Sequence, residues 1–186
     1  MASDPPPAPL LEIVRHRTAA AARAAASIER QAEAVVRLMQ AVADCVAAGG
    51  TIFTCGNGGS AAEALHLAEE LVGFYRDHGR PPRRAVCLAA DPTALTCIAN
   101  DAGFEHVFSR PLSALGRPGD LLVALSTSGN SPSILRALET ARAGGLMTAG
   151  LLGGDGGRAL PLCDHAIIVD APDGGSVQEG HLMLVH

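Results

Sequence analysis

The sequence predicts an α/β fold: a doubly wound, three-layer sandwich with a five-stranded parallel sheet, preceded by an N-terminal helical region. Short apolar runs alternate with helix-like stretches after Gly50. The runs are unbroken, as in Leu121-Leu122-Val123-Ala124-Leu125, which indicates strands that are buried on both faces and therefore parallel. The chain has 186 residues, of which 48% are hydrophobic, so it is long enough to cover such a sheet with helices.

The N-terminal part differs in composition from the rest of the chain. Residues 1–9 contain three consecutive prolines and are expected to form a disordered tip, whereas residues 10–186 are expected to form a single domain. From about residue 10 to residue 48, apolar residues fall at helical spacing, and Gly49-Gly50 provides a stop. The segment from Thr18 to Ala26 is nearly all alanine, which favours a helix but buries little surface per residue. We expect this helix to pack on a partner helix, such as one from another subunit.

The alternating βα pattern begins at Thr51. The predicted strands are 51–55, 85–89, 121–126, 147–152 and 165–169. The predicted helices are 61–75, 92–99, 132–143 and the segment from about 177 onward. Ligands of such folds bind beyond the C-terminal ends of the strands, so the loops after the first and third strands are expected to face one crevice.

Composition argues against several classes of partner. The net charge is -5 and the pI is near 5.7, so there is no basic stripe of the kind that binds nucleic acid. No apolar run approaches the roughly 20 residues of a membrane span, and the N-terminus does not resemble a signal peptide. The 5 cysteines lack a Cys-x-x-Cys pair and read as buried thiols of a reducing compartment. These observations predict a cytoplasmic protein without nucleic-acid or membrane partners.

Two loops are candidate anion sites: Cys55-Gly56-Asn57-Gly58-Gly59-Ser60 and Ser126-Thr127-Ser128-Gly129-Asn130-Ser131. Each lies between a strand and a helix, where free backbone N–H groups and the helix dipole favour a phosphate. Glycines such as Gly58 and Gly59 let the backbone approach a ligand closely. The first loop alone is equally consistent with an ordinary turn, and no Walker motif follows it. The second loop is more specific, because four hydroxyls in six residues exceed what helix capping requires.

Two further pairs carry acid–base or metal-binding groups. His66 and Glu70 are at i and i+4 of a predicted helix, so they share a face and could chelate a metal or pair with each other. An ordinary surface pair is equally compatible with that spacing, although Glu70, and not Glu69, is in register with His66. Gln178 and His186 are eight residues apart and can share only a broad helix face.

Taken together, these motifs resemble those of the sugar isomerase (SIS) domain family, and most closely its phosphoheptose isomerases. The resemblance runs from about Ala32 to His186 and makes residues 10–186 a single SIS domain that includes the N-terminal helical region. It also rests on three further motifs: Leu67-Ala68-Glu69-Glu70-Leu71, Asn100-Asp101-x-Gly103-Phe104 and Gly119-Asp120-Leu121-Leu122.

The resemblance implies a homotetrameric enzyme, with active sites shared between subunits, that converts sedoheptulose 7-phosphate to D-glycero-D-manno-heptose 7-phosphate. It implies one zinc ion per subunit. The family's phosphate-binding positions match Ser60, Ser126, Thr127, Ser128 and Ser131. Its sugar-contacting positions match Asn57 and Asp101, and its zinc-binding positions match His66, Glu70, Gln178 and His186. Gly58, Gly59 and Gln178 complete the expected substrate-binding set.

Ketose–aldose exchange moves a proton between C1 and C2 through an enediolate, so it needs a base, a proton shuttle and a group that holds negative charge. We assign Glu70 as the base and His186 as the acid or shuttle. Zinc could polarise the carbonyl and stabilise the enediolate. Because a carboxylate bound to zinc is a weaker base, either the metal coordination loosens during turnover or the metal is mainly structural or electrostatic.

Two alternatives stay open at this point. One is a non-catalytic SIS-domain regulator that binds a phosphosugar or a protein, since such proteins keep the fold and can lose catalytic groups. The presence of His66, Glu70, Gln178 and His186 favours the enzyme. The other is an isomerase of a different phosphosugar, because the loops specify the phosphate better than they specify the sugar.

Overall fold

A five-stranded parallel sheet forms the centre of the protein, which confirms the predicted fold class. The computed structural model describes residues 8–76 and 78–186. The strand order is β2-β1-β3-β4-β5, and every neighbouring pair is parallel. The strands are β1 (Ile52–Cys55), β2 (Ala85–Cys87), β3 (Leu121–Ser126), β4 (Met147–Gly153) and β5 (His165–Val169). The chain changes direction across the sheet between β1 and β3, and ligands of doubly wound folds bind at such a switch point.

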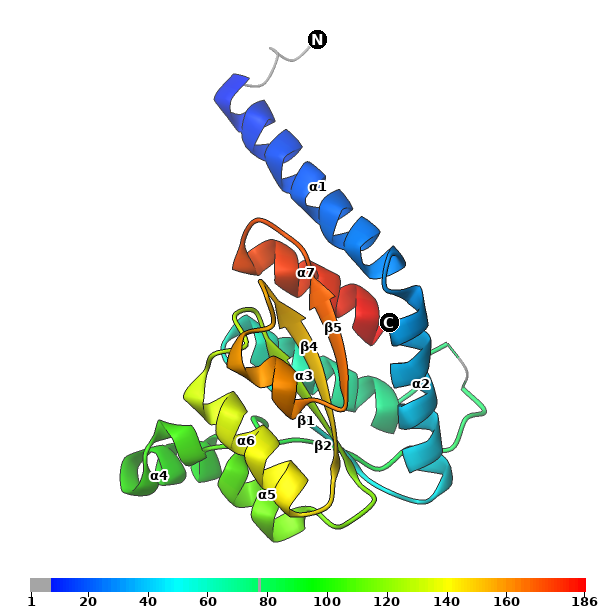
Figure 1. Ribbon diagram of the computed structural model, residues 1–186, viewed down its shortest axis with the longest axis vertical. Helices are drawn as coiled ribbons and strands as arrows, with labels where there is room; N and C mark the ends of the chain where they lie inside the picture. The colour runs from blue at the N-terminus through cyan, green and yellow to red at the C-terminus, as the bar shows by residue number, and fades with distance from the viewer. Residues whose placement is uncertain (1–7, 77) are drawn as a thin grey trace.

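Helices cover both faces of the sheet (Figure 1). One face carries α4 (Pro92–Ala102), η1 (Phe104–His106), α5 (Ser109–Leu115), α6 (Pro132–Ala143) and η2 (Gly157–Leu162). The other carries α2 (Ala32–Ala47), α3 (Gly59–Val72) and α7 (Gly174–Val185). Alternate strand residues serve the two cores: Phe53 and Leu122 lie in the first, and Ile52 and Leu121 lie in the second. Burial on both faces explains why the strand sequences are apolar without interruption.

The N-terminal helical region consists of two helices and not of one. The helices α1 (Ala8–Glu29) and α2 are separated at Arg30 and Gln31. The Gln31 amide donates to the carbonyl oxygen of Ile168 at 2.7 Å and accepts from the Ile168 N–H at 3.0 Å. These bonds satisfy the backbone N–H and carbonyl oxygen of Ile168 on the edge strand β5. They also fix the break between α1 and α2 at that edge.

The helix α1 begins before the expected position, and its first half projects away from the sheet (Figure 1). Ala8 and Pro9 are helical, although they were expected in the disordered tip; residues 1–7 lie outside the described residues. Near its C-terminal end α1 packs on α7, with Ala20 and Ala24 buried. Leu10, Ile13 and Val14 are each more than half exposed. The predicted partner helix is therefore α7 for the second half of α1, and the first half has no partner helix among the described residues.

Further differences concern short helices and the ends of elements. No helix was expected between residues 99 and 121, where the structure has η1 and α5, or between the fourth and fifth strands, where it has η2. The second strand ends at Cys87 and not at residue 89, and α3 spans Gly59–Val72 where 61–75 was expected. The short α5 is stabilised by tertiary burial, since Phe108 and Leu112 are each 1% exposed. Within the described residues, no helix is long and apolar enough to cross a membrane.

Candidate active site

The loop after β1 (residues 55–60, the Asn57 loop) and the loop after β3 (residues 126–131, the Ser126 loop) lie side by side. The Asn57 side-chain amide Nδ2 donates to Ser131 Oγ at 2.7 Å and to Ser133 Oγ at 3.0 Å. Asn57 Oδ1 is buried and has no hydrogen-bond partner among the described residues. The two loops therefore meet at one end of the sheet, which agrees with the prediction that they face the same place, and Asn57 has an acceptor left for a ligand.

Three helix N-termini lie at these two loops. The Asn57 loop leads into α3, the Ser126 loop leads into α6, and the first residue of α7, Gly174, lies against Thr127. Thr127 Oγ1 is 3.7 Å from the point where a Cβ on Gly174 would stand. Free N–H groups and aligned helix dipoles at one place favour an anion, which supports the predicted phosphate site.

The predicted hydroxyl residues differ in exposure. Ser60 and Ser126 are buried, whereas Ser128 is exposed. Ser126 Oγ accepts a hydrogen bond from the Gly129 N–H at 3.1 Å, and Ser128 Oγ accepts one from the Asn130 N–H at 3.2 Å. Because these backbone bonds use acceptor capacity and leave each hydroxyl proton free, the hydroxyls remain able to donate to a phosphate.

Gln178 belongs to α7, and its side chain contacts the first residues of α3, next to the phosphate loops. Its Nε2 is 3.5 Å from Ser60 Oγ, and a Cβ on Gly59 would stand 2.6 Å from Gln178 Oε1. The glycine at position 59 therefore makes room for this amide. The contact agrees with the predicted substrate-binding role of Gln178, while its side chain makes no hydrogen bond to His66, Glu70 or His186, the other three predicted zinc ligands.

Those three residues form a cluster (His66, Glu70 and His186, the His66 cluster). One ligand atom of each lies within 4.8 Å of the others. His66 Nε2 and Glu70 Oε1 are 3.1 Å apart, and the rings of His66 and His186 meet edge to face at 5.0 Å. The Tyr75 ring also stacks on His186, at 5.7 Å with an interplanar angle of 14°. Tyr75, which was not among the predicted site residues, is thus a second ring contact of His186.

The donor set of the His66 cluster fits a zinc ion. Zinc takes imidazole nitrogen and carboxylate oxygen at about 2.0–2.2 Å in tetrahedral sites, so two of its ligands lie roughly 3.3 Å apart. The separation of His66 Nε2 and Glu70 Oε1, 3.1 Å, is close to that value. The cluster supplies three protein ligands, which is the number that leaves a fourth position open for water or substrate.

Asp101 lies apart from these groups. It is exposed on α4, and its carboxylate accepts hydrogen bonds from Asn100 Nδ2 at 2.7 Å and from Cys97 Sγ at 3.5 Å. Both partners belong to the same helix. No hydrogen bond of the described residues joins Asp101 to the Asn57 loop or the Ser126 loop, and its role in sugar binding remains a prediction.

Comparison with known proteins identifies the family. The family profile described as "SIS domain" matches residues 16–153, which is well over half of the chain. This chain belongs to the SIS domain family. A curated relative of this SIS domain, the phosphoheptose isomerase of Chlorobaculum parvum, is 48% identical over 180 residues, covering 94% of this chain and 85% of that protein.

Solved structures agree with this assignment. The phosphoheptose isomerase of Neisseria gonorrhoeae superimposes on this SIS domain with a TM-score of 0.88 at 38% identity and covers 95% of both chains. The enzyme of Francisella tularensis gives a TM-score of 0.90 at 28% identity and covers 97% of this chain and 95% of that chain.

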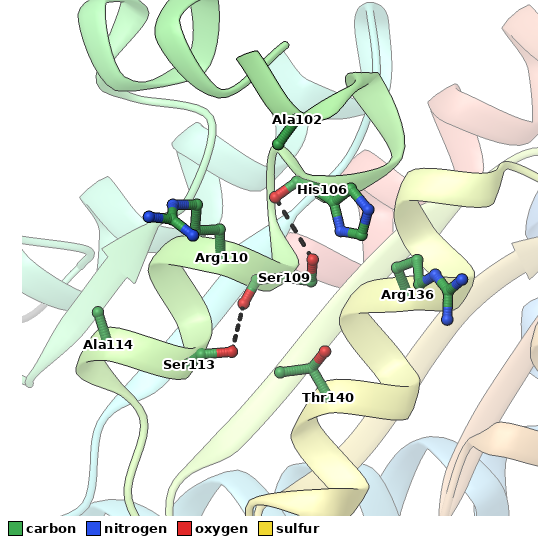
Figure 2. Close-up of a pocket in the computed structure, with 8 residues that line it drawn as sticks. All are labelled: Ala102, His106, Ser109, Arg110, Ser113, Ala114, Arg136 and Thr140. Atoms are coloured by element: carbon green, nitrogen blue, oxygen red, sulfur yellow. Dashed lines mark hydrogen bonds between the residues drawn. The ribbon is translucent and has the colours of Figure 1, made fainter.

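This SIS domain has another hollow, between α4, α5 and α6 (Figure 2). Arg110 and Arg136 lie on opposite sides of it. The hydroxyls of Ser109 and Ser113 each donate to a backbone carbonyl oxygen one helical turn earlier, at 3.4 and 2.9 Å. Arg136 also pairs with Glu139 at 3.2 Å. None of the predicted site residues lines this hollow, so it is separate from the predicted site.

Two polar residues beside the site were missed by the sequence analysis. Glu63 lies one turn before His66 on α3, and His181 lies one turn after Gln178 on α7. His181 is completely buried, and its Nδ1 is 3.8 Å from Glu63 Oε2. Their spacing could have pointed to them. Glu63 is three residues before His66 and His181 is three residues after Gln178, so each shares a helix face with a predicted site residue.

Proposed function

We propose that the protein is an aldose–ketose isomerase that converts sedoheptulose 7-phosphate to D-glycero-D-manno-heptose 7-phosphate. The observation that carries the proposal is that α3 begins at the end of the Asn57 loop, which is paired with the Ser126 loop, and carries His66 and Glu70 of the His66 cluster further along. The relatives named phosphoheptose isomerase, at 48% and 38% identity over most of the chain, support the same activity.

The loops would bind the phosphate and leave the sugar chain directed toward the His66 cluster. On α3, His66 follows Ser60 by six residues, which corresponds to about 9 Å along the helix axis. An extended seven-carbon chain can span this distance between its phosphate and C1. Asn57 Oδ1 and the Gln178 amide are then placed to contact hydroxyls between the two ends.

Glu70 is proposed as the base. It removes a proton from C1 of the ketose, and the electron pair forms the C1–C2 double bond of the enediolate while the carbonyl oxygen on C2 takes the negative charge. Return of a proton to C2, with transfer of the hydroxyl proton from O1 to O2, gives the aldose. His186, held between Tyr75 and His66, is the proposed shuttle between the two oxygens.

A zinc ion held by His66, Glu70 and His186 would supply Lewis-acid stabilisation of the developing negative charge. The spacing of these ligand atoms supports this proposal. Gln178 is proposed as a fourth ligand only if its side chain turns from Ser60 toward the cluster.

We also propose that the protein works as a homotetramer in the cytoplasm. The exposed side chains of Leu10, Ile13 and Val14 on α1 form an apolar face that suits a subunit interface. A shared active site would explain why Asp101 lies away from the crevice of its own chain. The 5 free cysteines support a reducing compartment.

The test is to incubate the purified protein with sedoheptulose 7-phosphate and to follow the aldose anomeric proton by NMR. Sedoheptulose without phosphate and fructose 6-phosphate serve as comparison substrates. Turnover of sedoheptulose 7-phosphate in preference to both supports the proposal. Faster turnover of fructose 6-phosphate would indicate an isomerase of another phosphosugar, and tight binding without turnover would indicate a regulator.

A further inference from the structure

Glu63 and His181 form a buried polar contact between α3 and α7. His181 is 0% exposed, and the Glu63 side chain is 13% exposed. His181 Nδ1 and Glu63 Oε2 are 3.8 Å apart, and neither atom has a hydrogen-bond partner among the described residues. Two buried polar atoms that face only each other are costly unless a proton is shared between them.

The other ring nitrogen of His181 decides which group carries that proton. His181 Nε2 lies 3.2 Å from the carbonyl oxygen of Leu152, which can only accept. Nε2 therefore carries the hydrogen, and in a neutral imidazole Nδ1 then carries a lone pair. A carboxylate at Glu63 would oppose this lone pair, whereas the neutral acid can donate to it. Burial acts in the same direction: it raises the pKa of Glu63 to about 7 and lowers the pKa of His181 to about 4.

The position of the contact relates it to the active site. On α3, Glu63 lies one turn after Ser60 and one turn before His66. On α7, His181 lies one turn after Gln178 and five residues before His186. Along these two helices, the Glu63–His181 pair therefore lies between two other pairs. Gln178 and Ser60 meet before it, and the rings of His66 and His186 meet after it.

The observed separation of 3.8 Å is longer than a hydrogen bond, and a shift of a few tenths of an ångström closes it. We propose that Glu63, as a neutral acid, makes this shift, donates a hydrogen bond to His181 Nδ1 and thereby fixes α7 against α3, so that His186 is aligned with His66 and Glu70. Glu63 and His181 are positioning residues, because neither is placed to touch the substrate. The alignment matters for catalysis only if the proposed function holds, but its effect on metal binding does not depend on that function.

The test compares two substitutions of Glu63. Glu63→Gln keeps a neutral side chain with an N–H donor, whereas Glu63→Leu keeps similar bulk without a donor. The matched controls are Glu69→Gln and Glu69→Leu, because Glu69 is exposed on the same helix. Each variant is titrated with zinc, and its kcat and KM for sedoheptulose 7-phosphate are measured. The tautomer of His181 is read from the ¹⁵N shifts of its ring.

We expect Glu63→Leu to weaken zinc binding at least tenfold and to lower kcat more than it raises KM. Glu63→Gln should stay within about threefold of the wild type, and both Glu69 controls should be unchanged. A purely structural role would lower thermal stability without changing zinc affinity in the folded variant. The wild-type ring should show a neutral His181 with its hydrogen on Nε2.

Four results would overturn the inference. They are unchanged zinc affinity in Glu63→Leu, an equal loss of zinc affinity in both Glu63 variants, a doubly protonated His181 ring, and a wild-type protein that binds no zinc. A wild-type protein that binds zinc with the expected variant pattern but does not isomerise the sugar would contradict the proposed function and leave this inference standing.

Discussion

Asn57 Nδ2 donates a hydrogen bond of 2.7 Å to Ser131 Oγ, and this contact joins the loop after β1 to the loop after β3. The bond fixes the distance between the two predicted phosphate-binding elements. Asn57 Oδ1 is buried and has no hydrogen-bond partner among the described residues. One side chain thus both assembles the site and offers an acceptor to the ligand.

Replacing Asn57 with alanine should therefore weaken phosphate-sugar binding. The substitution removes the donor to Ser131 Oγ and Ser133 Oγ, and a loss of about 1–3 kcal/mol corresponds to a rise in Kd of roughly 5- to 150-fold. Isothermal titration with sedoheptulose 7-phosphate measures the effect, and circular dichroism checks that the variant is folded. A folded variant with the wild-type Kd would show that Asn57 does not organise the site.

Zinc should stabilise the protein through the His66 cluster. At a zinc concentration about 100 times Kd, binding to the native state alone contributes about 2.7 kcal/mol, which raises Tm by roughly 5–10 °C. His66→Ala should abolish this rise, because it removes one of the three ligands of the cluster. The control is His16→Ala, since His16 is exposed on α1. An equal rise in Tm in both variants would mean that zinc binds at another site.

The acid group of Glu63 should make the stability of the protein fall as pH rises. Because its pKa is raised from 4.5 to about 7, its stabilising contribution is fully present below pH 4.5 and is lost as pH rises through 7. The free energy of unfolding of the wild type, relative to Glu63→Gln, should decrease by about 1–3 kcal/mol between pH 5 and pH 8. His181 titrates in both proteins, so its effect largely cancels. Urea unfolding across this pH range gives the difference, and a constant difference would mean that Glu63 has an ordinary pKa.

The exposed face of α1 should hold subunits together. Ile13→Glu combined with Val14→Glu places charge among side chains that are more than half exposed in the single chain. If this face is an interface, the pair should shift the molecular mass measured by light scattering toward smaller species, because burying unpaired charge is costly. Glu12→Gln on the same helix is the control. A tetramer that persists in the double variant would place the interface on another surface.

The sequence was sufficient for features that depend on local pattern. Unbroken apolar runs such as Leu121–Leu125 predicted the parallel sheet, and the i, i+4 spacing of His66 and Glu70 predicted their contact. The glycine- and serine-rich loops were placed correctly because strand ends and helix starts are marked by residue type.

Features that depend on contacts between distant residues were not predictable in this way. The break between α1 and α2 depends on Gln31 reaching Ile168, which is 137 residues away. The Glu63–His181 contact arises because α3 and α7 pack together, and neither residue alone carries a signal of burial. The place of Asp101, apart from the crevice, follows from the orientation of α4.

The most direct test of the central claim is the reaction of sedoheptulose 7-phosphate in D₂O, followed by NMR for the wild type and for Glu70→Gln. We predict that the wild type forms the aldose with deuterium at C2, and that Glu70→Gln loses at least about 1,000-fold in kcat with little change in substrate Kd. Absence of aldose with the wild type, or normal turnover by Glu70→Gln, would contradict the account.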